Sequence, residues 1–487
     1  MDYSQFLAMK QEISLLVLFL LVFLNDTFLP ARAQSSIGKI TCLLFGLFTL
    51  WGFCPVVVGD SVVSAFAGMY ETSPVIVAIK NILNVGVLIV LIQSLKWTSS
   101  EHQVIRRGEF YELLLVTLFG MYLMISGRHF LVFIIGLESA SLPLAAMVAF
   151  NKRRYESHEA AAKYILTAVF SSAILLMGLS FVYGLTGTLY FHHIAEGIAT
   201  AASANIVLLV IAIAFVMSGM GFKLSLVPFH LWTADVYQGA PTSVTSYLSV
   251  ISKGSAAFAF LVILWHVFGQ VYADAWEWML YALIILTITI GNLFAIRQKN
   301  LKRFLAFSSI SQAGYIMLGI VGNNPMGEAA LMYYILVYIF SNLAAFGVIG
   351  AIENNCGKVS MDDYNGLYKT NPRLAVTMML AMFSLAGIPP FAGFFSKFFI
   401  FTSAINQGSV AIYVLVLIAL INTIISLYYY LLVVKAMFIK DEDEFTVAPF
   451  RSAFSERLGM WICVAGILAL GIVSCFYDSL LNVVGIG

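Results

Sequence analysis

Long runs of apolar residues recur along almost the whole chain, and short polar stretches separate them. The hydrocarbon core of a membrane is about 30 Å thick, so a helix needs about 20 apolar residues to cross it. A helix also satisfies its own backbone hydrogen bonds, which lipid cannot do. Fourteen runs fit this description and predict an all-α polytopic membrane protein. We expect transmembrane helices near residues 13–29, 37–58, 74–95, 110–127, 129–150, 160–185, 205–237, 243–268, 278–297, 302–322, 328–352, 371–406, 410–438 and 456–484.

The composition excludes two broad classes of protein. Apolar residues make up 61% of the 487 residues and charged residues only 10%, whereas soluble domains carry about 25% charged residues. The formal net charge of +1 offers no basic face that would bind nucleic acid. Neither a soluble fold nor nucleic-acid binding fits, so the function has to be read from where the few charges lie.

The loops between the expected helices differ in charge. The odd-numbered loops hold nearly all of the loop lysines and arginines, among them Lys96, Arg107 and Arg154, while the even-numbered loops hold almost only Arg128. Short loops rich in lysine and arginine remain on the cytoplasmic side of a membrane. We therefore expect both chain termini on the opposite side, which is the periplasm if the protein lies in a bacterial inner membrane.

Two of the expected helices, 205–237 and 371–406, are too long for one straight crossing, and each contains residues that interrupt a helix. Broken helices at membrane depth are tolerated only where protein or a water-filled cavity surrounds the exposed backbone, and paired ones mark transport sites. The interrupting residues are Gly219, Gly221 and Pro228 in the seventh helix, and Gly387, Pro389, Pro390 and Gly393 in the twelfth.

The spacing of these breaks divides the chain into two five-helix units with flanking helices. We expect the first unit, helices four to eight, in residues 110–268 and the second, helices nine to thirteen, in residues 269–440. Residues 1–109 would supply three N-terminal helices, and residues 441–487 would supply the last helix. Because each unit has an odd number of helices, the second is inverted relative to the first, as in the inverted repeats of secondary transporters.

Several ionisable side chains lie inside these expected helices, where each costs about 2.5 to 3.5 kcal/mol on insertion scales. A residue that is this costly to insert is a candidate for a functional site. The seven candidates are Glu138, Lys163, Lys223, Lys253 and Lys397 within helices, His230 just beyond the break in the seventh helix, and Lys302 at the start of the tenth.

Lysine suits proton transfer because burial lowers its pKa from about 10.4, whereas a nearby carboxylate raises it again. If Glu138 approaches Lys223, a movement of that carboxylate would switch the lysine between holding and releasing a proton. His230 titrates nearest to neutrality and would pass a proton between Lys223 and Lys253. The series therefore predicts a polar axis at mid-membrane that carries protons.

Each candidate also has a purely structural interpretation. A buried pair of Glu138 and Lys223 would lock two helices together, and the other candidates would serve packing in the same way. Lys302 would then be a cytoplasmic anchor beside Arg303. Lys80, on the third helix and outside both units, is better explained as a structural residue or as one that extends towards the interface.

Three stretches of the chain resemble a known family. Residues 223–253 (KLSLVPFHLWTADVYQGAPTSVTSYLSVISK) and 384–397 (SLAGIPPFAGFFSK) are similar to two signatures of the antiporter-like subunits of NADH:quinone oxidoreductase, respiratory complex I. Residues 300–319 (NLKRFLAFSSISQAGYIMLG) look like the ninth-to-tenth-helix region of the same family. The resemblance covers essentially the whole chain, and Mrp-type sodium/proton antiporters share this fold.

The variant residues resemble the N-type subunit most. VPFHLWTADVYQGAP has the aromatic-His-Leu-Trp and Val-Tyr of that type, whereas the other types favour His-Thr-Trp-Leu-Pro-Asp. Lys397 fits the N and L types, because the M type is expected to carry glutamate there. We also expect the chain to lack the long lateral helix of the L type, because it ends at the fourteenth expected helix. Ala234 before Asp235 departs from the familiar Thr-Pro-Asp, and we expect this change to alter a loop.

The resemblance implies a role for most candidates. Glu138 and Lys223 would form the input pair, Lys253 the central relay and Lys397 the output-side lysine of the second unit. His230 would assist between Lys223 and Lys253. The subunit would move protons outward, driven by quinone reduction elsewhere in the complex.

No redox cofactor is expected in this chain. None of its five cysteines forms a C-x-x-C pair, so neither an iron-sulfur cluster nor a zinc site is encoded, and no GxGxxG or P-loop pattern follows a strand. NADH, FMN, iron-sulfur clusters and quinone would belong to partner subunits. The expected partners are neighbouring antiporter-like and small membrane subunits and the lipid bilayer. Two alternatives remain: an Mrp-type sodium/proton antiporter subunit, and a scaffold whose polar axis is inactive.

Overall fold

The chain folds almost entirely into helices. The computed structural model describes residues 5–28, 36–54, 62–99, 107–201, 206–269, 273–439, 447–473 and 475–486. The helices are α1 (Gln5–Ala8), α2 (Lys10–Phe28), α3 (Ile37–Gly52), α4 (Pro74–Ser99), α5 (Arg107–Ser126), α6 (Phe130–Val148), α7 (Tyr155–Thr186), α8 (Phe191–Ala201), α9 (Ile206–Leu224), α10 (Leu231–Gly239), α11 (Thr242–Tyr247), α12 (Lys253–Ile263), α13 (Ala273–Ala295), α14 (Leu301–Val321), α15 (Pro325–Cys356), α16 (Leu367–Thr370), α17 (Pro372–Ala386), α18 (Ala392–Ile405), α19 (Val410–Phe438), α20 (Phe454–Ile472) and α21 (Cys475–Ile486).

A few short elements complete the described structure. Two π-helical turns, η2 (Leu248–Ser252) and η3 (Leu264–Phe268), continue α11 and α12 into one long helical segment. A 3-10 turn, η4 (Asp362–Tyr364), follows α15. Strands β1 (Val63–Ala65) and β2 (Tyr70–Thr72) pair antiparallel as a small hairpin between α3 and α4.

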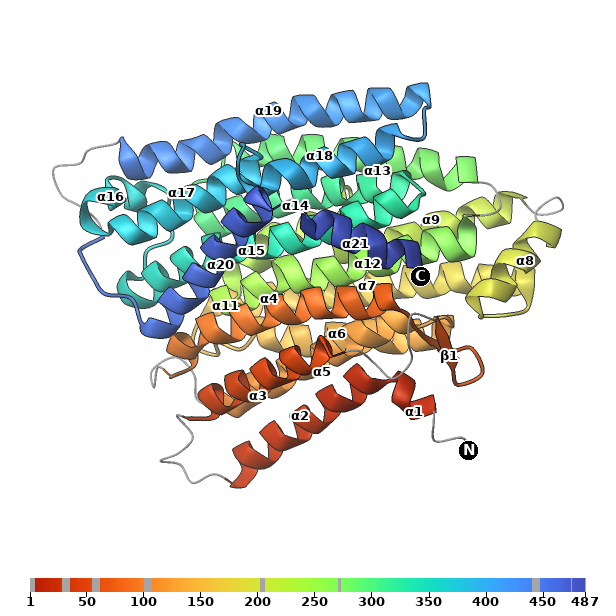
Figure 1. Cartoon of the computed structure of the whole chain (residues 1–487), viewed down its shortest axis with the longest axis horizontal. Coiled ribbons are helices and arrows are strands. Elements are labelled where there is room, and N and C mark those ends of the chain that lie inside the picture. The colour runs from red at the N-terminus through yellow and green to blue at the C-terminus, as the bar shows by residue number, and fades with distance from the viewer. Residues whose placement is uncertain are drawn as a thin grey trace.

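The apolar runs predicted from the sequence are helices, which confirms the all-α polytopic fold. Among the described residues, 12 helical segments are long and apolar enough to cross a membrane, and α3, α17 and α18 are shorter apolar helices. Most helices lie side by side and run in the same general direction, so their ends gather at two opposite faces (Figure 1). The count of fourteen crossings and the inverted repeat remain predictions.

Two predicted helices need correction, and one short helix was not predicted. The second helix was expected over 37–58, but α3 ends at Gly52, and residues 55–58 lie outside the described part. The last helix was expected to be continuous over 456–484, yet it is divided into α20 and α21. The amphipathic helix α8 was not predicted, because its 11 residues are too few to span a bilayer.

The helices differ in how completely their neighbours cover them. Every residue in the apolar 18-residue stretch of α14 is buried, and so are 89% of the residues in the corresponding stretch of 242–268. In α7 and α19 only 33% of the residues in that stretch are buried. Exposed apolar residues follow one face of α19, as Val410, Val414, Leu417 and Ile424 show. The segments that cross the centre therefore lie inside protein, and the outer faces are left for lipid or neighbouring subunits.

Both of the long apolar runs, 205–237 and 371–406, are broken as predicted, but Gly219, Gly221 and Gly393 lie within helices and not in the breaks. In the first run α9 ends at Leu224 and α10 begins at Leu231, and in the second α17 ends at Ala386 and α18 begins at Ala392. Gly393 lies inside α18, where a Cβ atom would collide with the backbone carbonyl of Ser384. This glycine lets the two halves of the broken helix approach each other closely.

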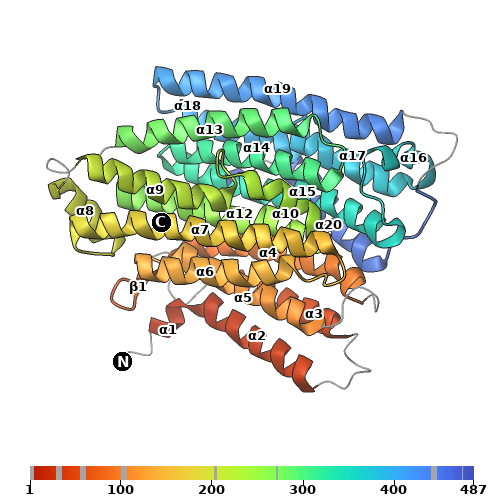
Figure 2. The ribbon, with the colours of Figure 1, turned by 180° about the vertical axis from the view of Figure 1, so that it is seen from behind.

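The first broken helix lies against the centre of the molecule. Figure 2 shows α7 and α9 side by side on the rear face, and α10 packs against both α7 and α14. The Trp232 indole donates to the carbonyl of Phe222 at 3.1 Å, across the break. The Val227 backbone N–H donates to the Thr287 hydroxyl at 3.0 Å, which ties the break to α13.

Candidate functional site

Lys223 lies in the last turn of α9 and points towards α6. Its ammonium group donates a hydrogen bond to the Ser141 hydroxyl, and both side chains are buried. Ser141 follows Glu138 by three residues on α6, a spacing that places both on one face of a helix. The structure therefore brings both members of the predicted input pair to the same contact between α6 and α9.

Glu138 does not pair directly with Lys223. Among the described ion pairs, none joins these two residues within 4.0 Å. The carboxylate is nevertheless close enough for its charge to act on Lys223 and on the Tyr164 hydroxyl. Ser141 is thus the group that contacts the lysine, while Glu138 acts on it through space.

His230 lies at the end of the first break, directly before α10. Its ring is half-buried, and in the described structure its Nδ1 atom is buried without a hydrogen-bond partner. The charge of Lys253 acts on this ring. The histidine therefore lies in the chain between the two buried lysines, at the end of the break, and its part in proton transfer stays a prediction.

Lys253 begins α12, directly after the π-helical turn η2. Such turns are rare and occur frequently at functional sites. The buried Lys253 ammonium donates to the Ser309 hydroxyl of α14 at 2.7 Å and lies 5.5 Å from the centre of the Tyr237 ring. The Tyr237 hydroxyl is itself 3.4 Å from Ser309 Oγ. Lys253 therefore reaches α14 near the centre of the molecule.

A cluster of buried neutral polar groups continues along α14. The Ser308 hydroxyl is 2.5 Å from the Tyr430 hydroxyl of α19. The Gln312 side-chain amide donates to that same Tyr430 hydroxyl at 3.1 Å and to the Leu385 carbonyl at 3.2 Å. Tyr334 of α15 donates to the Gln312 side-chain oxygen. The cluster joins α14 to the end of α17.

Lys397 closes this series at the second break. Its buried ammonium donates to the carbonyl groups of Leu385 at 3.1 Å and of Ala386 at 2.9 Å. The last carbonyls of a helix have no partner within it and carry a partial negative charge. Because Leu385 also accepts from Gln312, hydrogen bonds run without interruption from Ser308 to Lys397.

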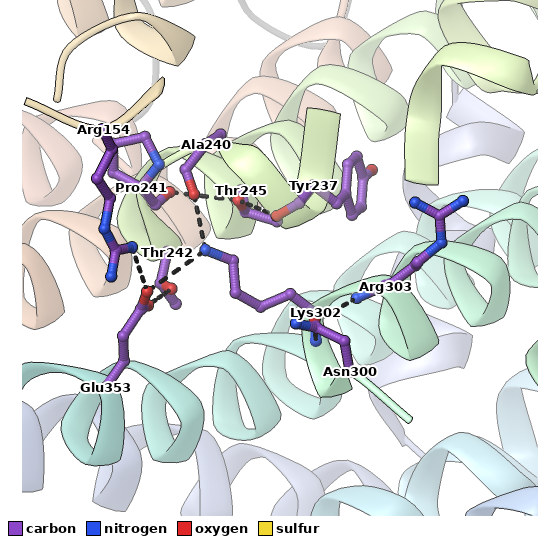
Figure 3. A network of polar contacts seen from close by, with 10 residues as sticks. All are labelled: Arg154, Tyr237, Ala240, Pro241, Thr242, Thr245, Asn300, Lys302, Arg303 and Glu353. Atoms are coloured by element: carbon purple, nitrogen blue, oxygen red, sulfur yellow. Dashed lines mark hydrogen bonds and ion pairs between the residues drawn. The ribbon is translucent and has the colours of Figure 1, made fainter. Parts of the chain in front are cut away.

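Lys302 takes part in a separate network near one face of the molecule (Figure 3). Its Nζ atom donates to the Ala240 carbonyl at 2.7 Å and lies 3.7 Å from the Glu353 carboxylate. Arg154 contacts the same carboxylate at 2.9 Å, and the Thr242 hydroxyl donates to it. Only 1% of Lys302 is exposed. The lysine is thus a buried member of an ion-pair network, and whether it carries protons or serves as a structural anchor stays a prediction.

Lys163 lies apart from the buried series. Its side chain is 44% exposed and forms ion pairs with Glu159 at 2.8 Å and Asp235 at 2.7 Å. Arg303 contacts the other oxygen of Asp235 at 2.6 Å. Ala234 and Asp235 belong to α10, so the departure from the familiar Thr-Pro-Asp falls in a helix and not in a loop. The helix directs Asp235 towards α7, where it holds Lys163 at the surface.

Lys80 forms a buried ion pair that the sequence left unidentified. It contacts Glu12 of α2 at 2.5 Å, and both side chains are 1% exposed. Lys80 also donates to the Tyr70 hydroxyl at 3.3 Å. The pair joins α2 to α4, and the described hydrogen bonds of Lys80 go to Glu12 and Tyr70, which agrees with a structural role.

Sequence reasoning missed the neutral groups that link the charges. Ser141, Ser309, Gln312 and Tyr430 are each common polar residues that carry no signal of their own in an apolar helix. Gln312 was the most visible, because an amide is unusual in a run as apolar as that of α14. Glu353 was missed because it falls one residue beyond the predicted helix 328–352.

The described residues contain no group of three or more histidine, cysteine, aspartate or glutamate side chains that could hold a metal ion. The five cysteines are free thiols. The side chains that the structure gathers at the candidate site are lysines, carboxylates, a histidine and hydroxyl groups, which can each donate or accept a proton.

Comparison with known proteins shows the family to which the chain belongs. Residues 127–426 match the model of a family described as NADH:quinone oxidoreductase/Mrp antiporter, TM. The chain is 52% identical over 481 residues to the NADH-quinone oxidoreductase subunit N of Phocaeicola vulgatus, covering 99% of both chains. It is similar to a chain of respiratory complex I from Thermus thermophilus with bound aureothin, with a TM-score of 0.78, 31% identity, and coverage of 96% of this chain and 97% of that one.

A more distant likeness shows the fold alone. A chain of the Mrp complex from Dietzia sp. DQ12-45-1b has a TM-score of 0.81 and 22% sequence identity, with 100% of this chain and 97% of that chain covered. The family model and the high identity to a full-length relative together settle the classification. The chain belongs to the NADH:quinone oxidoreductase/Mrp antiporter family of transmembrane proteins.

Proposed function

We propose that this chain is the N-type, proton-translocating membrane subunit of an NADH-quinone oxidoreductase, respiratory complex I. The relative from Phocaeicola vulgatus, named as subunit N, is aligned over 99% of both chains. The chain from Thermus thermophilus complex I is 31% identical. The observation that carries the proposal is the series of buried lysines, each of which contacts polar groups of a neighbouring helix.

The proposed route begins at the contact between α6 and α9. Glu138 and Lys223 form the input pair, and Ser141, on the same helix as Glu138, accepts the hydrogen bond of Lys223. His230 receives the proton at the first break and passes it to Lys253 through water, since the groups do not touch directly. From Lys253 the route continues through Ser309 to the neighbouring Ser308 on α14.

The second part of the route follows the α14 cluster to Lys397. Hydrogen bonds through Tyr430, Gln312 and the Leu385 carbonyl hold Lys397 in register with α14. Carbonyl and amide groups do not carry a proton themselves, so water beside them completes the path. Lys397 is the output-side lysine. Lys163 adjusts the charge at the start of α7, and Lys302 supplies protons to Lys253.

The driving force comes from partner subunits. NADH, FMN, iron-sulfur clusters and quinone are proposed to lie in other chains of the complex, so this chain takes part in the translocase reaction without redox chemistry of its own. Its partners are neighbouring antiporter-like and small membrane subunits. We place the chain in a bacterial inner membrane, where the loop charges favour both termini in the periplasm.

The test is to replace Lys223 by alanine in the assembled complex. We expect electron transfer to become uncoupled or slowed, and proton pumping into closed vesicles to fall by about tenfold or more, because a proton-transfer group is removed. A complex that assembles and pumps as before would instead support the scaffold alternative.

A second candidate is an Mrp-type sodium/proton antiporter subunit. The family description includes these antiporters, and the fold of the Dietzia chain is similar. Co-purification decides between the two: redox subunits would support the complex I subunit, whereas sodium-dependent proton movement without redox subunits would support the antiporter.

A further inference from the structure

A polar chamber lies at the face where α4, α7, α11, α15 and α20 gather. Its lining includes Gln93, Arg154, Thr242, Glu353 and Glu456. It contains about 50 Å³ of space open to water, whereas one water needs roughly 10–15 Å³. The helix ends around it belong to the arginine- and lysine-rich loops, which the charge pattern places on the cytoplasmic side. The chamber therefore has room for a few water molecules at that side of the protein.

Glu353 lies between this chamber and the buried interior of the protein. Its side chain is 12% exposed, that of Arg154 on one side is 50% exposed, and that of Lys302 on the other is 2% exposed. Arg154 contacts Glu353 Oε1 at 2.9 Å, and Lys302 Nζ is 3.7 Å from the same oxygen (Figure 3). The Glu353 carboxylate thus contacts the half-exposed Arg154 and lies close to the buried Lys302.

Lys302 leads from this carboxylate to the central relay. It lies seven residues before Ser309 on α14, which is about 10 Å along a helix and returns to the same side after two turns. Ser309 accepts the hydrogen bond of Lys253. The Tyr237 hydroxyl is 3.4 Å from Ser309 Oγ. Tyr237 precedes Ala240 by three residues, and the Ala240 carbonyl accepts the hydrogen bond of Lys302.

We propose that Glu353 is the intake carboxylate of this subunit: it takes protons from water in the chamber and delivers them to Lys302, which feeds Lys253. The inference rests on the proposed function. Water in the chamber gives a proton to the Glu353 carboxylate, and the hydroxide that remains returns to the bulk solution on the same side. The neutral acid then gives its proton to the neutral amine of Lys302, which has already released its own proton towards Lys253. Each cycle restores both groups. Arg154 keeps its charge throughout and holds Glu353 in place.

Two matched pairs of variants test this proposal in the reconstituted complex. Glu353→Gln and Glu353→Asn remove the acid, whereas Glu353→Asp keeps it and matches asparagine in length. We expect both amides to lower the proton-pumping rate by about tenfold and the aspartate to retain most of it. If Glu353→Gln does not assemble, the aspartate and asparagine variants still provide the comparison.

A pH profile separates proton intake from a structural role. Without the carboxylate, protons must reach Lys302 directly from dilute bulk solution. The residual pumping of Glu353→Gln should therefore fall more steeply than that of the unmodified complex as the pH on the chamber side is raised. A residue that only holds helices together would leave the shape of this profile unchanged.

Glu456 provides the control on the same chamber. It is buried, but its carboxylate accepts from the Ala453 backbone N–H at 2.9 Å and the Asn354 amide at 3.1 Å. Among the described residues it forms no ion pair with a lysine. Glu456→Gln should pump normally. Unchanged pumping and an unchanged pH profile in Glu353→Gln would overturn the proposal, as would an equal loss in Glu456→Gln. Lys223→Ala, measured in parallel, shows whether the subunit pumps at all.

Discussion

At the scale of single residues, the Glu12–Lys80 pair differs from the lysines of the proposed route. Both partners are 1% exposed, and they lie 2.5 Å apart between α2 and α4. Taking charges out of water is costly, and breaking such a pair leaves one buried charge without its partner. The pair therefore fixes the position of α2 and does not offer a lysine that can change its charge freely.

This interpretation predicts the effect of uncharged substitutions. Lys80→Met alone should destabilise the subunit by about 3–5 kcal/mol, while the double variant Glu12→Met with Lys80→Met should recover most of that loss. The melting temperature of the purified complex measures both. The double variant should pump normally. If it melts normally but loses pumping, the pair belongs to the proton route after all.

Lys397 allows its two roles to be separated by substitution. Arginine would keep donors for the Leu385 and Ala386 carbonyls, but it does not release its proton in proteins. We expect Lys397→Arg to assemble and to pump about tenfold more slowly or less. Native gels report assembly, and acidification of vesicles reports pumping. Normal pumping by the arginine variant would exclude Lys397 as a proton-transfer group.

At the scale of elements, the sequence predicted that two helices are broken, because their apolar runs are too long and contain proline and glycine. It could not predict where each break falls. Gly219 lies inside α9, where a Cβ atom would be 2.6 Å from that of Leu175. The need for this glycine is set by a neighbouring helix that is distant in sequence. Close contacts of this kind leave no local pattern.

The contrast between two helical glycines tests this explanation. A Cβ atom on Gly393 would collide with the Ser384 carbonyl, whereas one on Gly184 of α7 would meet nothing within 4 Å. Gly393→Ala should therefore destabilise the subunit by about 1–3 kcal/mol, and Gly184→Ala should not. Thermal unfolding of the complex measures the difference. Equal stability of the two variants would mean that the halves of the second broken helix are not held closely.

The candidate site, too, could be predicted only as far as it depends on local sequence. Costly charges such as Lys223, Lys253 and Lys397 stand out in apolar helices, and the structure buries all three beside polar groups. Lys163 stood out equally, yet it is exposed, because its position on the helix face depends on how α7 packs. Burial depends on tertiary packing, which the sequence alone does not display.

At the scale of the whole molecule, the charge asymmetry of the loops predicts an orientation that labelling can test. Lys152 follows α6 and His192 lies on α8, and both are exposed. Cysteine at position 152 should react with a membrane-impermeant maleimide from the cytoplasmic side only, and cysteine at position 192 from the periplasmic side only. Intact cells and inverted vesicles distinguish the sides. Labelling of both positions from the same side would contradict the proposed topology.

The hydrogen bonds of Lys397 have a consequence for how the molecule moves during turnover. An ammonium group has three N–H donors, and the amine that remains after one proton leaves has two. Two carbonyl groups, those of Leu385 and Ala386, accept from this side chain. The lysine can therefore lose its charge while the end of α17 keeps both donors, so discharge requires no rearrangement of the backbone at the second break.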